Sequence, residues 1–321
     1  MLGYFRIMTN HPLVTYFGNG PYCYANSTAM LLGSIGENIS PATIEVLSGV
    51  GLGAALLGPS KLLFFSTFSG SPDRGLSQAL TSLGFSFTER FYPDKNDDPF
   101  PALDKDLVTS PAVLGPLNMG YLDYNPRSSS LSGTDHYILA FGLGVHEAYL
   151  HDPAGFPSVS LFRDQLRKAW QAEDIGYRRE YFRSWSNPKR TVSTNELGIF
   201  TATCEYFRQL YREDDRSAHE KGLITGKEAI LTVAKKAQES ELTELEVGHL
   251  THFALPLASH RSLDFAEFFA PFDSKLTDLK RQQSEFSGRA HTLLMRRDFK
   301  EFSSKLTQIA EVEQAFRQAI G

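Results

Sequence analysis

Residues 135–155 read DHYILAFGLGVHEAYLHDPAG and contain the clearest β-strand signal in the first half of the chain. Two β-prone runs, 137–141 and 148–150, lie on either side of a turn with two glycines. Apolar runs joined by a short glycine-containing turn predict an antiparallel β-hairpin. The Asp-Pro-Ala-Gly sequence at 152–155 predicts where the second strand ends.

His136 and Asp152 lie 16 residues apart, and their midpoint is Gly144, inside the predicted turn. A hairpin folded about Gly144 predicts that the two side chains lie opposite each other on one face of the sheet. There the carboxylate can accept a hydrogen bond from one imidazole nitrogen, which leaves the other to take a proton from a nucleophile. A register shift of one residue would move Asp152 to the other face. The alternative is a surface hairpin that ends in an Asp-Pro turn.

The sequence GPYCYANS at 20–27 places Cys23 at the start of a predicted helix that continues through apolar residues to Ile35. Unpaired N–H groups and the positive dipole end at a helix N-terminus favour a thiolate. The same N–H groups can hold the oxyanion that forms when the sulfur attacks a carbonyl. The alternative is a buried core cysteine. With His136 and Asp152, Cys23 predicts a nucleophile–base–carboxylate triad.

The remaining sequence divides into two parts of different character. The first part alternates short helices with strand candidates, and its polar, basic segment 178–190 predicts a linker. From Ser193 onward apolar residues recur at three- and four-residue steps, and Ser193 with Glu196 and Thr225 with Glu228 predict capping boxes. We therefore expect an α/β domain with an antiparallel sheet at residues 1–190, followed by an all-α helical bundle at 191–321.

These features resemble the papain-like cysteine enzymes, in which a Cys that opens a helix precedes a strand His and, one hairpin later, an Asp or Asn. The similarity is greatest to acyltransferases of the butirosin-biosynthesis protein H type, with a peptidase-C39-like domain followed by a helical domain. It covers most of residues 10–185 in a patchy way. The segments that carry it are 112–124, 135–140, 149–155 and 166–177.

The resemblance implies that Cys23 is the nucleophile, His136 the base and Asp152 the group that orients it. It also implies acyl transfer to an amine from a carrier-protein thioester, with no cofactor beyond phosphopantetheine on the donor. Hydrolysis by a cysteine peptidase, amidase or thioesterase stays open, since the triad does not choose the acceptor. So does a non-catalytic binding or assembly protein on the same fold.

The sequence departs from the family pattern around the cysteine. Tyr22 and Tyr24 occupy positions where the family usually has His and an acidic residue, and both are candidates for substrate contact. The oxyanion-hole Gln usually found about six residues before the cysteine is replaced by Phe17. Asn19 is the nearest amide and therefore a candidate oxyanion donor.

Charge and composition limit the partners. Lys and Arg number 32 and Asp and Glu 37, so the net charge of −5 gives no global attraction to nucleic acid or an anionic membrane. Arg178, Arg179 and Arg183 lie among aromatic residues and are candidates for docking an acidic partner such as a carrier protein. The alternative is a solvated linker. The other expected substrate form is a small acyl molecule.

Two cysteines and an N-terminus without an apolar targeting run indicate a soluble, cytoplasmic protein. A metal site is not expected, although Asp135, His146 and His151 crowd the hairpin, because strand alternation separates His136 from His151. A metal-dependent hydrolase on this hairpin is the third alternative. Cys204 falls on an apolar helical stripe and is expected in the core.

Overall fold

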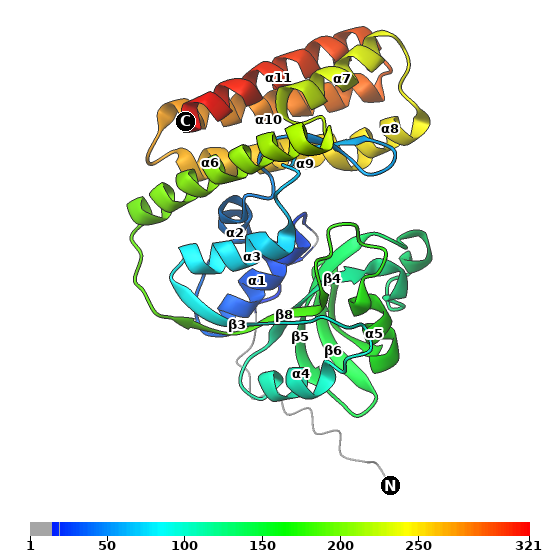
Figure 1. Ribbon diagram of the computed structural model, residues 1–321, viewed down its shortest axis with the longest axis vertical. Helices are drawn as coiled ribbons and strands as arrows, with labels where there is room; N and C mark the ends of the chain where they lie inside the picture. Colours follow the sequence, from blue (N-terminus) through cyan, green and yellow to red (C-terminus); the bar gives the residue numbers. More distant parts are fainter. Residues whose placement is uncertain (1–14, 19) are drawn as a thin grey trace. The chain divides into compact units, whose positions relative to one another are not determined.

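The computed structural model describes residues 15–18 and 20–321. Contacts divide these residues into two compact units (Figure 1). The first unit takes in residues up to Ile44 together with Leu83–Ser193, and the second takes in Glu45–Ser82 and Thr194–Gly321. The expected fold class is confirmed: a mixed α/β region with an antiparallel sheet precedes an all-helical region.

The α/β unit is built on a six-stranded antiparallel sheet with strand order β3-β8-β4-β5-β6-β7. Its elements are α1 (Cys23–Gly33), β3 (Phe85–Tyr92), α4 (Phe100–Leu107), β4 (Ala112–Asn118), η1 (Met119–Tyr121), η2 (Ser128–Ser130), β5 (Asp135–Leu143), β6 (Glu147–Asp152), β7 (Phe156–Phe162), α5 (Arg163–Gln171) and β8 (Tyr181–Arg190). Every residue of β4 is buried, as expected for an apolar strand with neighbours on both edges. The apolar core on one face joins Ile138 and Ala140 of β5 to Leu103 of α4 and Trp170 of α5.

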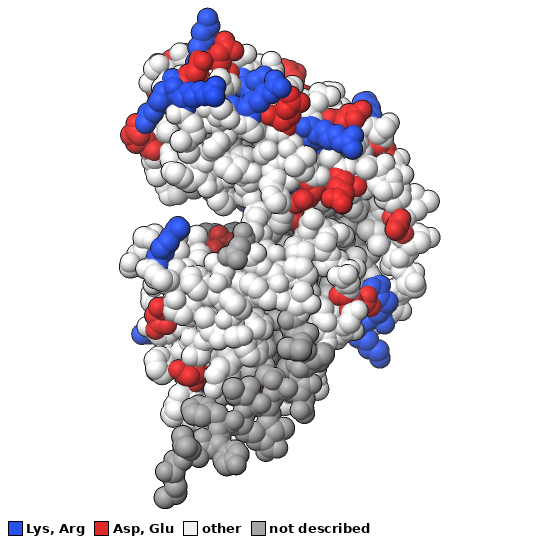
Figure 2. Space-filling view, turned by 180° about the vertical axis from the view of Figure 1, so that it is seen from behind, with Lys and Arg blue, Asp and Glu red and all other residues white. Residues whose placement is uncertain are grey.

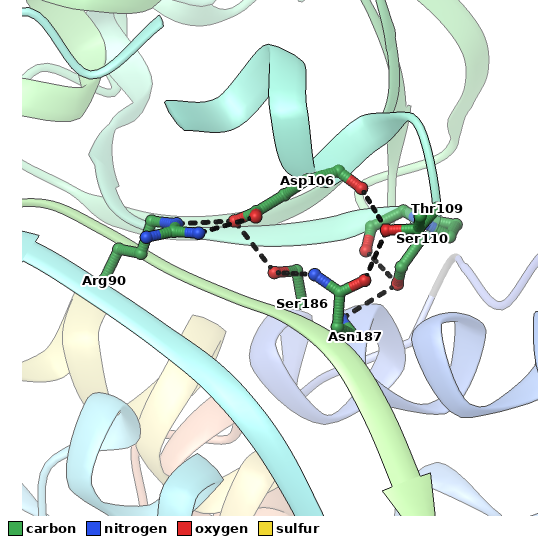
Figure 3. Close-up of polar contacts among 7 residues, drawn as sticks. Arg90, Asp106, Thr109, Ser110, Ser186 and Asn187 are labelled. Carbon is green, nitrogen blue, oxygen red and sulfur yellow. Dashed lines mark hydrogen bonds and ion pairs between the residues drawn. The ribbon is translucent and has the colours of Figure 1, made fainter. Parts of the chain in front are cut away.

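A polar network ties β3, α4 and β8 together (Figure 3). The carboxylate of Asp106, which is buried on α4, accepts two hydrogen bonds of 2.7 Å from Arg90 on β3 and one of 3.0 Å from Ser186 on β8. Asn187 extends the network, because its amide nitrogen donates to Ser186 and its oxygen accepts from Thr109 at 2.6 Å. A buried carboxylate is stable when it is paired and hydrogen-bonded in this way.

The segment 178–190 is not the linker that its polarity predicts. Residues Tyr181–Arg190 form β8, which pairs with β3 and β4 inside the sheet, and six of its residues are buried. Trp185 is fully buried and the buried Trp170 indole donates to the backbone oxygen of Arg183 at 2.8 Å. The polar side chains of this strand are satisfied by partners on neighbouring elements, which composition alone does not reveal.

The helical unit combines the long helices of residues 194–321 with the earlier segment 45–82. Its elements are β1 (Ala55–Leu57), β2 (Leu62–Phe64), α3 (Pro72–Ser82), α6 (Glu196–Lys221), α7 (Gly226–Gln238), α8 (Glu244–His249), the π-helical turn η3 (Leu250–Ala254), α9 (Leu255–Phe269), α10 (Ser274–Met295) and α11 (Phe299–Ile320). The boundary between the units falls within α2 (Pro41–Ser48). Among the described residues, no helix is both long and apolar enough to cross a membrane.

Residues 45–82 group with the helices, in contrast to a single boundary near residue 190. Leu63 and Phe65 join the apolar core of α7, α9 and α11. Glu45, fully buried, accepts a 2.7 Å hydrogen bond from Arg261 on α9, and Arg74 makes two hydrogen bonds to Glu213 on α6. These contacts connect positions far apart in the chain, so their pattern is invisible in local sequence.

Asp214→Asn is expected to raise the free energy of unfolding by about 2 kcal/mol at pH 8, as measured by denaturant titration. Burial raises the pKa of Asp214 from its usual 3.8 to about 6, despite the 3.1 Å hydrogen bond that its carboxylate accepts from the Ser69 amide. The native protein therefore binds this proton more tightly than the unfolded chain, and stability falls as the pH rises from about 4 to about 6. Asparagine keeps the acceptor without the charge.

The gain should disappear near pH 4, where native Asp214 is already protonated. Asp215→Asn, at the exposed neighbouring position, is the matched control and should show no such pH-dependent gain. An Asp214→Asn protein that is no more stable than the wild type at pH 8 would contradict this account of the buried carboxylate.

Candidate functional site

Cys23 begins α1 and is half-buried. The residue before it, Tyr22, adopts the left-handed conformation (φ 69°, ψ 56°), which costs a non-glycine residue of order 1 kcal/mol or more. This sharp turn carries the chain from the Gly20-Pro21 segment into the helix and places the thiol at the helix N-terminus. No side chain caps α1 at Tyr22, and its first turn holds no acidic residue. The N-terminal dipole of α1 therefore acts on the sulfur without a competing carboxylate from its own turn.

His136 and Asp152 are joined by a 2.6 Å hydrogen bond between Nε2 and Oδ1. The predicted direct opposition of the two residues is wrong, however. Leu139 pairs with His151, and an irregularity follows Ala140, so Asp152 lies two positions out of register with His136. The turn also closes later than expected, with the Gly144 amide donating to the Glu147 oxygen at 2.7 Å. Because the offset is even, both side chains still share a face.

The imidazole of His136 links Asp152 to Cys23. Since Nε2 is bonded to Asp152, Nδ1 is the nitrogen left for the hydrogen bond with the Cys23 sulfur. Burial alone would lower the pKa of His136, but the charges and hydrogen bonds of Cys23 and Asp152 outweigh it and raise the pKa to about 10. A protonated imidazole beside the sulfur stabilises a thiolate by direct charge pairing.

Asp152 is held by more partners than the sequence indicates. Oδ1 also accepts a 2.6 Å hydrogen bond from the Ala154 amide, and Oδ2 accepts one of 2.8 Å from the Tyr124 hydroxyl. Burial alone would raise the pKa of Asp152, but His136 and these hydrogen bonds lower it. The Tyr16 hydroxyl donates to the backbone oxygen of Asp152 at 2.7 Å. Sequence reasoning missed Tyr124, because nothing in its spacing points to Asp152.

Two contacts fasten α1 to β5 and so bring Cys23 to His136. The Ser27 hydroxyl donates to the backbone oxygen of Tyr137 at 3.2 Å. The rings of Tyr24 and Tyr137 meet edge to face, with centroids 6.0 Å apart. Tyr24 is therefore buried and packs against β5, and its role as a substrate contact stays a prediction. Tyr22 is also buried, and Asn19 lies outside the described residues.

The three arginines do not form the predicted docking patch. Arg183 is only 3% exposed, pairs with Glu89 and Glu180, and lies over the Trp185 ring at 5.6 Å. Arg178 is half-buried and packs over a tyrosine ring, so Arg179 alone of the three is exposed. The prediction of a docking patch fails because Arg183 belongs to β8 and its charge is paired inside the sheet, while Arg178 packs on the first residue of that strand. On the face shown in Figure 2, Lys and Arg lie interspersed with Asp and Glu.

The remaining candidate residues are the histidines of the hairpin, which were considered as metal ligands, and Cys204. Within the described part of the chain, no three His, Cys, Asp or Glu side chains are placed to share a metal ion. His151 stacks on Phe141 and its Nδ1 accepts from the Ser158 amide, while the exposed His146 lies in the turn. Cys204 is in the core as predicted, where burial raises its pKa to about 11.

Comparison with known proteins shows the family to which this chain belongs. Residues 219–321 match the YobF C-terminal domain. The chain is 41% identical over 305 residues to the uncharacterized protein YobF of Bacillus subtilis (strain 168), covering 95% of this chain and 97% of that protein. The chain therefore belongs to the YobF family.

A structural similarity exists to a crystal structure from Bacillus anthracis that is provisionally assigned as a C39-like peptidase. The TM-score is 0.38 and the identity 15%, and the similarity covers 57% of this chain and 98% of that one. The resemblance to the butirosin-biosynthesis type stays a prediction.

Proposed function

We propose that this protein is a cysteine-dependent acyl-transfer enzyme in which Cys23 is the nucleophile, His136 the acid–base group and Asp152 the carboxylate that orients it. The observation that supports this most is the chain of hydrogen bonds from Asp152 through Nε2 of His136 to the imidazole's contact with Cys23. A buried carboxylate, a buried imidazole and a half-exposed thiol in this order are the parts of nucleophilic catalysis.

The reaction proceeds in two steps. The Cys23 thiolate attacks the acyl carbonyl carbon, and the oxyanion that forms is stabilised by the backbone N–H of Cys23 and the dipole of α1. As the bond to the leaving group breaks, the His136 imidazolium gives its proton to that group, and an acyl-Cys23 thioester remains. His136, now neutral, then takes a proton from the acceptor, which attacks the thioester and releases Cys23 as the thiolate.

We assign the acceptor as an amine and the donor as a thioester, which gives an amide and a free thiol. This choice rests on the resemblance in the sequence to amide-forming acyltransferases. Water as the acceptor would give peptidase, amidase or thioesterase activity with the same residues. The experiment therefore has to distinguish an amine acceptor from water.

Incubation of the full chain with a short acyl N-acetylcysteamine thioester is expected to give one acyl group on Cys23, detected by intact and peptide mass spectrometry. Cys23→Ala should remain folded and stay unmodified. Added primary amine should discharge the adduct faster than buffer does and yield the amide. Discharge by water alone would assign a hydrolase, and no adduct on Cys23 with any of several acyl thioesters or peptide esters would contradict the proposal.

A further inference from the structure

We propose that Tyr124 is a positioning residue, whose hydroxyl fixes the orientation of the Asp152 carboxylate toward His136; this inference rests on the proposed function. The Tyr124 hydroxyl is 2.8 Å from Oδ2 of Asp152. Oδ1 is the oxygen that bonds Nε2 of His136 at 2.6 Å. A carboxylate can rotate about its Cβ–Cγ bond, and a donor on the second oxygen keeps the first one aimed at the imidazole.

The hydroxyl is chemically suited to this role. Burial and the charge of Asp152 raise the pKa of Tyr124 well above its usual value of about 10. The hydroxyl therefore stays protonated at every pH at which the site would work, and it remains a donor to Oδ2. Among the described contacts, Tyr124 supplies the hydrogen bond to Oδ2, while Ala154 and His136 share Oδ1. Without Tyr124, one oxygen of a fully buried carboxylate would lose that partner.

Hydrogen bonds within the loop 119–134 and a ring contact with β7 fix the position of Tyr124. The Asn118 side-chain oxygen accepts hydrogen bonds from the amides of Gly120 and Gly133, which clamps the two ends of the 119–134 loop together. The Asn125 amide donates to the Leu122 oxygen and closes the turn around Tyr124. The Tyr124 ring packs on Phe156 of β7, with centroids 5.8 Å apart. A rigid support of this kind is what a positioning residue requires.

The test is Tyr124→Phe, which keeps the ring and removes only the hydroxyl. The rate of Cys23 alkylation by iodoacetamide should fall about five-fold at pH 6, the size expected for one hydrogen bond, and change less than two-fold at pH 9. The acid limb of the pH profile should move to higher pH, because a loosely held Asp152 stabilises the His136 imidazolium less. Tyr121→Phe, an exposed tyrosine on the same loop, is the matched control and should leave the profile unchanged.

A double-mutant cycle separates positioning from mere stability. In an Asp152→Asn background, Tyr124→Phe should have no further effect on the alkylation profile, because the hydroxyl acts through the carboxylate. An equal effect in both backgrounds, or a wild-type profile in the single variant, would overturn the role of Tyr124 and leave the proposed function standing. A wild-type Cys23 that reacts at pH 6 no faster than an unfolded thiol would instead remove the proposed function itself.

Discussion

Replacing His136 with alanine is expected to slow alkylation of Cys23 at pH 6 by at least about 10-fold. The raised pKa of His136 means that its imidazole is protonated at this pH, so the substitution removes a positive charge beside the sulfur. An ordinary thiol with a pKa near 8.5 is only about 0.3% ionised at pH 6. The greater nucleophilicity of a more basic thiolate offsets part of this loss, which is why the expected change is about 10-fold and not several hundred-fold.

The matched control for this variant is His146→Ala, which removes an exposed imidazole in the turn of the same hairpin. It should alkylate at the wild-type rate. The measurement is the second-order rate with iodoacetamide, read at the Cys23 peptide by mass spectrometry. Equal rates in the wild type and His136→Ala would show that the imidazole does not activate the thiol.

Glu313→Leu is expected to lower the free energy of unfolding of the helical unit by about 3–5 kcal/mol. Glu313 is buried on α11, where it accepts a 2.8 Å hydrogen bond from Tyr211 and one of 2.9 Å from Gln283, and its carboxylate lies 3.7 Å from the buried Lys280 amine. Removing the carboxylate leaves a buried ammonium group without its counter-charge. Burial already lowers the pKa of Lys280, against the pull of Glu313.

The double variant Lys280→Met/Glu313→Leu should recover most of the loss, because two well-packed apolar side chains replace the ion pair without leaving a lone charge. Glu285→Gln breaks the exposed pair with Arg289 on α10 and should cost less than about 1 kcal/mol. Chemical denaturation followed by circular dichroism measures all three. A double variant as unstable as Glu313→Leu would refute the view that the cost comes from the stranded charge.

The contact between His136 and Asp152 was predicted from the sequence, but the strand register that produces it was not. The turn pairs Gly142 with Tyr149, a register that on its own would put His136 and Asp152 on opposite faces of the sheet. The extra residue after Ala140 shifts the register by one and returns the two side chains to one face, where they form their hydrogen bond. Gly142 lies at this irregularity, and a glycine inside a strand is a signal for a bulge, but the prediction placed this glycine in the turn.

The role of Tyr124 was missed because Tyr124 lies in a loop, whereas its partner Asp152 lies at the end of β6, 28 residues later in the sequence. A contact between a loop and a distant strand produces no periodic pattern in the sequence.

Helix starts show how local signals mislead. The capping box expected at Ser193 is replaced by Asn195, whose side chain accepts from the Gly198 amide, and Thr225 makes no side-chain cap. The capping box that does form joins Thr243 to Glu246. The capping residue of α6 thus lies two positions after the predicted one, which is within the usual uncertainty of a helix boundary.

The division into units was the least predictable feature. Residues 45–82 have the mixed composition of the first half, yet the core contacts of Phe65 and the ion pair of Glu45 with Arg261 group them with the helices. Apolar periodicity shows that a segment has a buried face, but it does not say which part of the chain covers that face.

The most direct test of a nucleophilic Cys23 is its alkylation rate between pH 5 and 9, with buried Cys204 as the internal control. A nucleophilic Cys23 should react rapidly at pH 6 and gain little speed up to pH 8, while Cys204 should stay unlabelled until the protein is unfolded. A Cys23 rate that climbs about ten-fold per pH unit toward an ordinary thiol midpoint near 8.5 would contradict an activated thiolate, as would labelling only after unfolding.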